Sequence, residues 1–112
     1  MCTNIELNKV TSEVVEAALK VMSKDLYKVI LYGSYARGDY DDESDIDVMI
    51  MVNMSREELV QYRRKINDFC AEIDLQYDVL LAPKLQSQDF FDEWVNKLPF
   101  YRNVAKDGIM YV

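Results

Sequence analysis

Three short apolar segments alternate with longer segments of helical periodicity, and this alternation restricts the chain to a fold that mixes helices with a sheet. The three segments are residues 26–33, 45–52 and 75–82. Each is rich in β-branched, aliphatic or aromatic residues, which is typical of strands. We predict a strand for each of them, and we expect Pro83 to stop the third because proline cannot donate to a β-ladder.

The segments around these strands have the pattern of amphipathic helices. Residues 9–23 carry an apolar stripe at helical spacing. Ser55 begins a capping-box pattern ahead of a regular apolar face, and Ser87 is a candidate N-cap. Pro99 could open a last helix that ends at Gly108. The order α-β-β-α-β-α-α predicts an α/β (α+β) fold, with a small mixed β-sheet and flanking helices.

Length and composition favour one globular domain over residues 1–112, with 50% hydrophobic and 29% charged residues. Cys2 and Cys70 are far apart and form no Cys-x-x-Cys pair, which fits a reducing cytosol. The first ten residues lack the pattern of a signal peptide, and no apolar run approaches the ~20 residues of a membrane span. We therefore expect a cytoplasmic protein without a membrane partner.

The charge of the chain narrows the chemistry that it can perform. The net charge is −7, so tight binding to a nucleic-acid backbone, which depends on Lys and Arg, is not expected. Six of the acids lie between residues 39 and 47, where they must be solvated or hold cations. The chain has no histidine, so any catalysis must use carboxylates, hydroxyls, amines or metals bound by oxygen.

Gly33 and Ser34 follow the first predicted strand and are suited to bind phosphate. Glycine lets the backbone approach an anion closely, free N–H groups can point at it, and the serine hydroxyl adds a donor. Arg37 offers a planar fork of donors to phosphate, or alternatively an ion-pair partner that stabilises the acidic loop. We predict that residues 34–44 form a polar connection with one helical turn at its start.

Asp45 and Asp47 open the second predicted strand with one apolar residue between them. Alternate residues of a strand share a face, so both carboxylates point the same way and repel each other unless cations separate them. Oxygen ligands suit Mg²⁺ or Mn²⁺, and such a pair could bridge two ions. The third predicted strand supplies Asp78 at mid-strand, while Asp74 has the same parity and could compete for the same role.

These motifs resemble the signature of the DNA polymerase-β-like nucleotidyltransferases, and most closely their stand-alone minimal members. The matching segments are GSYARG at 33–38, SDIDV at 44–48, YDV at 77–79, FYRN at 100–103 and GI at 108–109. The resemblance implies that Gly33 and Ser34 hold NTP phosphates. It also implies that Asp45, Asp47 and Asp78 bind two Mg²⁺ or Mn²⁺ ions, with Asp78 helping to deprotonate the attacking hydroxyl.

The same resemblance implies transfer of a nucleoside monophosphate, AMP from ATP or another NTP, to an acceptor hydroxyl. Short members of the family commonly pair with a HEPN-domain protein, often a toxin, and some act as antitoxins by adding AMP to it. In so small a chain the acceptor pocket must come from a partner, a second copy of the chain or a macromolecular substrate. A protein acceptor is favoured over a polynucleotide one because the chain is acidic.

Two other functions remain compatible with the sequence. One is a nucleotide- or metal-binding module with little turnover that sequesters a protein partner. The other is an antibiotic nucleotidyltransferase, which the short chain disfavours. Purely structural roles are also expected for several residues: Tyr35 and Tyr40 as exposed loop aromatics, Cys70 as a small core residue, and the aromatic residues of segment 90–94 as part of the core.

Overall fold

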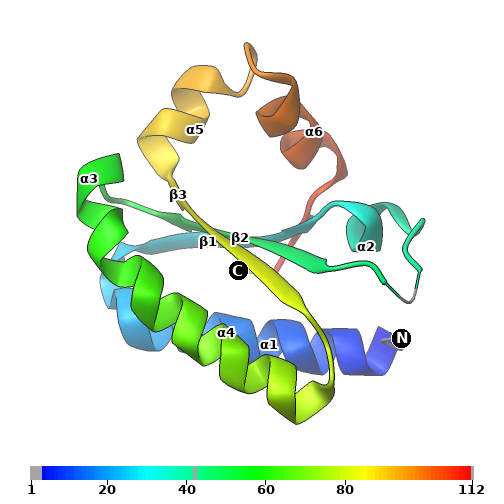
Figure 1. The fold of residues 1–112 in the computed structure, drawn as a ribbon. Coiled ribbons are helices and arrows are strands. Elements are labelled where there is room, and N and C mark those ends of the chain that lie inside the picture. The colour runs from blue at the N-terminus through cyan, green and yellow to red at the C-terminus, as the bar shows by residue number, and fades with distance from the viewer. Residues whose placement is uncertain (1–3, 42, 112) are drawn as a thin grey trace.

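A computed structural model describes residues 4–41 and 43–111, so Cys2 and Asp42 lie outside the described residues. Four strands form one sheet between two layers of helices (Figure 1). The strands are β1 (Leu26–Tyr32), β2 (Ile46–Val52), β3 (Leu81–Ser87) and β4 (Ile109–Met110). The helices are α1 (Asn4–Met22), α2 (Ser34–Arg37), α3 (Arg56–Leu59), α4 (Arg63–Tyr77), α5 (Gln88–Trp94) and α6 (Pro99–Asp107), with 3₁₀ turns η1 (Ser23–Asp25) and η2 (Val60–Tyr62).

The sheet is mixed and has the strand order β3-β2-β1-β4. The β1 strand pairs antiparallel with β2 and with β4, whereas β2 pairs parallel with β3. The β2 strand therefore lies inside the sheet with a neighbour on each side, and all of its residues except Asp47 are buried. This confirms the predicted mixed sheet with flanking helices.

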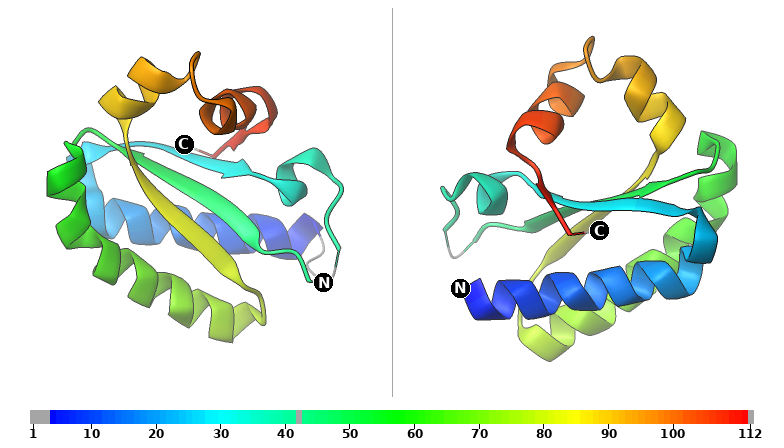
Figure 2. Two further views of the ribbon diagram at one scale, coloured as in Figure 1. Left: turned by 45° about the horizontal axis from the view of Figure 1, so that its top comes forward. Right: turned by 180° about the vertical axis from the view of Figure 1, so that it is seen from behind.

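The two faces of the sheet pack against different helices, as Figure 2 shows from two sides. On one face, residues such as Val48 and Ile50 of β2 join the core formed with α1 and α4. On the other face, Met49 and Met51 pack with residues of α5 and α6, among them Phe91. The alternation along β2 follows from the period-2 geometry of a strand.

Most of the predicted elements are confirmed. The first helix, the first two strands and the helical turn after Gly33 are present, with boundaries that differ by a few residues. The capping box at Ser55 and Glu58 forms in both directions, and Ser87 caps α5 by accepting a hydrogen bond from the Phe90 N–H. Pro99 is the first residue of α6, whose C-cap is Gly108.

The third strand is placed wrongly by the sequence, because β3 begins at Leu81 and not at residue 75. Residues 75–77 continue α4, since Tyr77 extends the helical stripe that buries Cys70 and Ile73. Leu75, which the strand pattern would turn toward the core, is 87% exposed. Pro83 lies within β3 and does not stop it, because β3 is an edge strand that can lose an N–H donor.

Candidate functional site

The end of β1 forms a tight turn that needs glycine. Gly33 has a φ of 73° and precedes α2, and its carbonyl accepts the N–H groups of Ala36 and Arg37 at 3.1 Å each. A β-carbon at position 33 would overlap the Oδ2 atom of Asp47. The backbone at Gly33 and the carboxylate of Asp47 are therefore in direct proximity, and only glycine permits that approach.

Asp45 and Asp47 lie at the start of β2, as the sequence predicts. Asp47 is half-buried and pairs in register with Tyr32 of β1, whereas Asp45 precedes the strand and is exposed. Burial raises the pKa of Asp47, the charge of Asp45 raises it further, and Arg37 lowers it. The charge of Asp45 thus opposes the ionisation of Asp47, which is the electrostatic setting that a bound cation would relieve.

A cavity of about 460 Å³ opens at this end of the sheet. One side of it is formed by residues of β1, α2 and β2: Tyr32, Gly33, Ser34, Arg37 and Asp47. Four of the residues predicted for the site from the sequence therefore line one cavity. A fifth, Asp45, lies two residues before Asp47 in the chain. Burial, and then the charge of Asp47, raises the pKa of Tyr32 to about 12, so this hydroxyl stays neutral beside the carboxylate.

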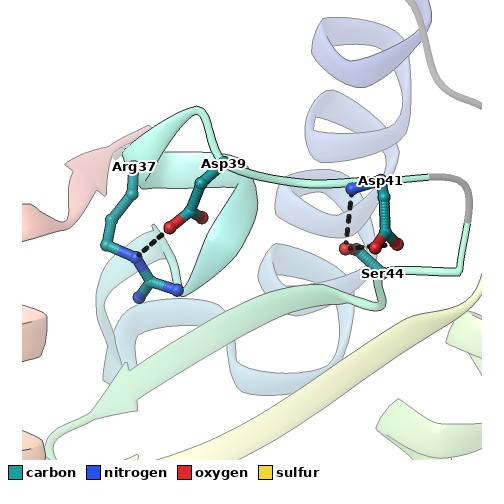
Figure 3. A network of polar contacts seen from close by, with 4 residues as sticks. All are labelled: Arg37, Asp39, Asp41 and Ser44. Atoms are coloured by element: carbon teal, nitrogen blue, oxygen red, sulfur yellow. Dashed lines mark hydrogen bonds and ion pairs between the residues drawn. The ribbon is translucent and has the colours of Figure 1, made fainter.

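Arg37 forms an ion pair in the acidic loop and also lines the cavity, so its phosphate-binding role stays a prediction. Its Nε–H donates to Asp39 Oδ2 at 3.2 Å, and both side chains are about half exposed (Figure 3). An exposed pair of this kind contributes ~0–1 kcal/mol, so it does little to hold Arg37 away from the cavity. The loop that follows is closed separately, because the backbone N–H of Asp41 donates to Ser44 Oγ at 3.0 Å.

Asp78 does not join Asp45 and Asp47. It is exposed, and it caps the C-terminus of α4 in the left-handed conformation with a φ of 52°. Within residues 4–41 and 43–111, no three Asp, Glu or Cys side chains lie close enough to hold a metal ion. The mid-strand position expected for Asp78 is wrong because β3 starts three residues beyond it, and Ala82 is the residue that pairs with Asp47.

Asp74, the competing carboxylate, has a structural role in this conformation. Its Oδ1 atom accepts the N–H of Leu81 at 2.8 Å and so joins the end of α4 to the start of β3. Burial raises the pKa of Asp74, the hydrogen bond from Leu81 lowers it, and the charge of Asp45 raises it.

Tyr35 and Tyr40 are not exposed loop aromatics. Tyr35 is 8% exposed, and its ring stacks on that of Tyr40 with centroids 4.2 Å apart and planes 8° apart. The pair packs the α2 turn onto the core next to α1 and α4. Tyr35 therefore supports the conformation of the Gly33–Ser34 turn by anchoring α2 in this core.

The opposite side of the cavity is formed by α6, which sequence reasoning does not identify as part of the site. Its residues there are Phe100, Asn103, Val104 and Asp107. Their spacing of three, four and seven residues defines one helix face. The signal is present in the sequence, but only the packing of α6 over β1 brings this face to the cavity (Figure 1).

Asp45 and Asp47 fit a divalent cation of the Mg²⁺ type. This ion prefers oxygen ligands, and in phosphate-transfer sites it commonly takes one or two carboxylates together with substrate phosphates and water. The donor set is complete in that sense without a third carboxylate. The close approach of Asp47 to the Gly33 backbone would let an ion and a phosphate share the same corner of the cavity.

Comparison with known proteins identifies the family. Residues 12–106 match the model of the nucleotidyltransferase domain. Two proteins of Methanocaldococcus jannaschii, both provisionally named protein adenylyltransferase, are similar. One is 34% identical over 100 residues, covering 89% of this chain and 92% of its own length. The other is 31% identical over 97 residues, covering 87% and 96%.

A solved structure has the same fold. It is the crystal structure of a protein from Sulfolobus solfataricus with the provisional title of nucleotidyltransferase, with a TM-score of 0.60 and 22% identity. The match covers 96% of this chain and 80% of that one. At this identity the likeness concerns the fold, whereas the family follows from the domain match and the curated relatives. The chain thus belongs to the nucleotidyltransferase domain family and is a transferase of nucleotides.

Proposed function

We propose that the chain transfers AMP from ATP to a hydroxyl group of a protein acceptor. The observation that carries the proposal is the juxtaposition of the Gly33 turn with the carboxylate of Asp47 in one cavity. The provisional names of the curated relatives, which describe protein adenylyltransferases, support both the nucleotide and the class of acceptor.

The phosphates of ATP would bind at the Gly33–Ser34 turn. The missing side chain of Gly33 permits close approach of the backbone, and the Ser34 hydroxyl is a further donor. Arg37 lines the same cavity and adds a positive charge with several donors. Its weak exposed pair with Asp39 can be exchanged for a phosphate at little cost.

Asp45 and Asp47 would hold two divalent cations, with remaining ligands from phosphate and water. When bound, such ions neutralise charge on the α-phosphate and on the departing pyrophosphate. In the transfer, the acceptor oxygen forms a bond to the α-phosphorus, the bond to pyrophosphate breaks, and the hydroxyl proton leaves to a base. A role for Asp78 as that base or as a third ligand remains a prediction from sequence, and its exposed position does not support it.

The acceptor is proposed to be a HEPN-domain protein encoded beside this chain, on the resemblance to minimal nucleotidyltransferases. The net charge of −7 favours a protein over a polynucleotide as the partner. The cavity offers surfaces for a nucleotide, and the acceptor would approach from outside the chain.

A binding module with little turnover is a second candidate function. The observation in its favour is that, among the described residues, no three Asp, Glu or Cys side chains form a group that could hold a metal ion. Such a protein would bind ATP with Mg²⁺ yet release no pyrophosphate with or without its partner. The two functions therefore differ in one measurable product.

The test is incubation of the purified chain with α-labelled ATP, Mg²⁺ and the product of the neighbouring gene. We expect the mass of the partner to rise by one AMP per modified hydroxyl, with an equal amount of pyrophosphate released. Asp45→Asn and Asp47→Asn should each reduce transfer on the order of 1000-fold while the fold is kept. The matched control is Asp68→Asn on the outer side of α4, which should transfer at the rate of the unaltered chain.

Each outcome decides between the candidates. Pyrophosphate and labelled partner that both depend on Asp45 and Asp47 support the transferase. ATP binding without pyrophosphate under any condition supports the binding module. Transfer at the ordinary rate in either Asp→Asn variant would exclude the proposed metal site.

A further inference from the structure

The two sides of the cavity differ in chemistry. The side formed by β1, α2 and β2 offers a glycine turn, a hydroxyl, an arginine and a carboxylate. The α6 side offers an aromatic ring, an amide, an aliphatic group and a carboxylate. In the described part of the chain, the basic residues of α6, Arg102 and Lys106, are not among those that line the cavity. The α6 side is therefore unsuited to phosphate and suited to a neutral ring system with polar edges.

Phe100 supplies a ring that is accessible and held in place. It is 45% exposed at the mouth of the cavity. The ring of Tyr32 meets it edge-on, with centroids 5.6 Å apart and planes 85° apart, and Lys84 Nζ lies 5.5 Å from its centroid. An exposed aromatic ring fixed by its neighbours is a surface on which a nucleobase can stack.

Asn103 supplies a donor and an acceptor from the same helix face. Adenine presents one acceptor and one amino donor on its N7/N6 edge, which an amide can pair in a bidentate manner. Guanine presents two acceptors on the equivalent edge, and these call for arginine or lysine. Because the polar group that α6 offers beside Phe100 is the amide of Asn103, this helix face matches adenine better than guanine.

Asp107 lies at the other end of the same face. The antiparallel pairing of Leu31 with Ile109 runs the chain after α6 alongside the end of β1. Asp107 precedes Ile109 by two residues, just as Gly33 follows Leu31 by two. This pairing brings Asp107 and the Gly33 turn to neighbouring positions in the cavity. A carboxylate is a suitable acceptor for ribose hydroxyls, so Asp107 is suited to the sugar that joins the base to the phosphates.

Contacts with β1, β3 and the preceding turn hold α6 in position. The Tyr101 hydroxyl donates to Gln86 Oε1 at 3.0 Å across to β3, and Val104 is 3% exposed. Gly108 has no room for a β-carbon between the Val104 carbonyl and Ile30, so the helix end sits directly on β1. Arg102 donates to the Asn96 carbonyl at 2.9 Å and ties the helix to the preceding turn.

We propose that the α6 face of Phe100, Asn103 and Asp107 binds the nucleoside half of the nucleotide, with Asn103 selecting adenine over guanine. The inference rests on the proposed function, because it assumes that the triphosphate lies at Gly33 and Ser34. It adds the residues that choose the base, and it assigns the stacking surface to Phe100.

The test measures binding of ATP, GTP and inorganic tripolyphosphate, each with Mg²⁺, to the full chain by calorimetry. The unaltered chain should prefer ATP to GTP. Asn103→Ala should weaken the binding of ATP by roughly 10- to 100-fold and leave the binding of GTP nearly unchanged, so that the preference for ATP disappears. Phe100→Leu should weaken ATP and GTP alike, by about 10-fold. Neither change should alter tripolyphosphate binding, and the matched control Lys106→Ala on the exposed side of α6 should alter nothing.

The outcomes separate this inference from the proposed function. ATP binding that needs Asp47 but is unaffected in Asn103→Ala and Phe100→Leu would overturn the α6 assignment alone. Equal loss of tripolyphosphate binding in these variants would also overturn it, because the change would then act through the fold. Failure of the unaltered chain to bind ATP, or binding that is indifferent to Mg²⁺ and to Asp47→Asn, would overturn both.

Discussion

The two faces of the sheet are built from alternate residues of the same strands, yet they differ in how completely they are covered. The face toward α1 and α4 is closed by helices of 19 and 15 residues. The face toward α5 and α6 (Figure 2) is covered by helices of 7 and 9 residues. The cavity is lined on one side by residues of α6. Short helices leave the start of β2 uncovered, and that is where Asp47 lies.

The difference teaches how one strand serves both stability and chemistry. In β2, Val48 and Ile50 are completely buried against the long helices, whereas Asp47, the residue directly before Val48, lines the cavity. A carboxylate is costly inside a closed core because its charge must be desolvated. It is tolerated on the face toward α5 and α6, which we call the open face. A residue with metal-binding chemistry can be placed there without disturbing the core one residue away.

Gly33→Ala should reduce both transfer and stability, because it disturbs the turn on which the open face depends. The substitution imposes a φ of 73° on a residue with a β-carbon and drives that carbon into Asp47. We expect transfer to fall on the order of 100-fold and the free energy of unfolding to fall by about 1–3 kcal/mol. Turnover assays and denaturant unfolding measure the two effects.

Gly38→Ala is the matched control for Gly33→Ala. Gly38 also has a positive φ, 86°, but a β-carbon there would meet no atom within 4 Å. It should therefore lose stability by about 1 kcal/mol and keep its transfer rate. Equal loss of transfer in the two variants would show that strain, and not the approach to Asp47, is what matters.

Ile50→Ala and Met49→Ala compare the two faces at adjacent residues. Both side chains are completely buried, so each substitution should lower the free energy of unfolding by about 2–5 kcal/mol. Met49 belongs to the cluster that includes Tyr101 and Val104 of α6, so its loss should also weaken ATP binding severalfold. Ile50→Ala should leave ATP affinity unchanged at a temperature where it is folded, and weaker binding in that variant would contradict the division between faces.

Ionisable groups buried on each face should make stability fall at alkaline pH. Burial, and then the charge of Asp74, raises the pKa of the Cys70 thiol to about 12 in α4, from 9.0. The contribution of this thiol to the free energy of unfolding is fully present below pH 9. It is lost as pH rises toward 12, because only the unfolded thiol ionises in that window. Cys70→Ala should flatten the fall between pH 9 and 10 in urea unfolding.

Ionisation of Tyr32 on the open face should account for the fall in stability at the next higher range of pH. The pKa of Tyr32 is raised from 10.0 to about 12, so its contribution to the free energy of unfolding is lost between those pH values. This second loss of stability should still be seen in the Cys70→Ala variant. Tyr32→Phe should remove it. An unchanged slope above pH 9 in both variants would mean that neither group is buried in solution as it is in the structure.

The sequence predicts the placement of the candidate site residues well where local pattern and local geometry coincide. Gly33, Ser34 and Asp47 lie within fifteen residues of one another, and the strand–turn–strand pattern around them needs no distant information. The α6 side of the cavity is different, because the role of Asn103 depends on the packing of the helix over β1. No local pattern carries that information, although the spacing from Phe100 to Asp107 marks a single helix face.

The prediction of the third strand is wrong for a different physical reason. Residues 75–82 alternate as a strand would, but Tyr77 also continues the helical stripe of α4, and its hydroxyl donates to Glu13 of α1 at 3.4 Å. Tertiary packing against α1 therefore decides in favour of the helix. Pro83 then suggests a strand end where there is none, because only the topology reveals that β3 is an edge strand.

Asp78→Asn is the smallest expected effect and the sharpest test of the difference between pattern and structure. Asparagine accepts the left-handed conformation at least as well as aspartate, so α4 should still end there. Asp78 is exposed and apart from Asp45 and Asp47, so we expect transfer within about twofold of the unaltered chain. The assay is pyrophosphate release with the acceptor present, beside Asp47→Asn. A loss as large as that of Asp47→Asn would mean that the segment after α4 rearranges in the working complex. The open face would then hold three carboxylates, and the family pattern at residues 77–79 would describe the active state better than this conformation does.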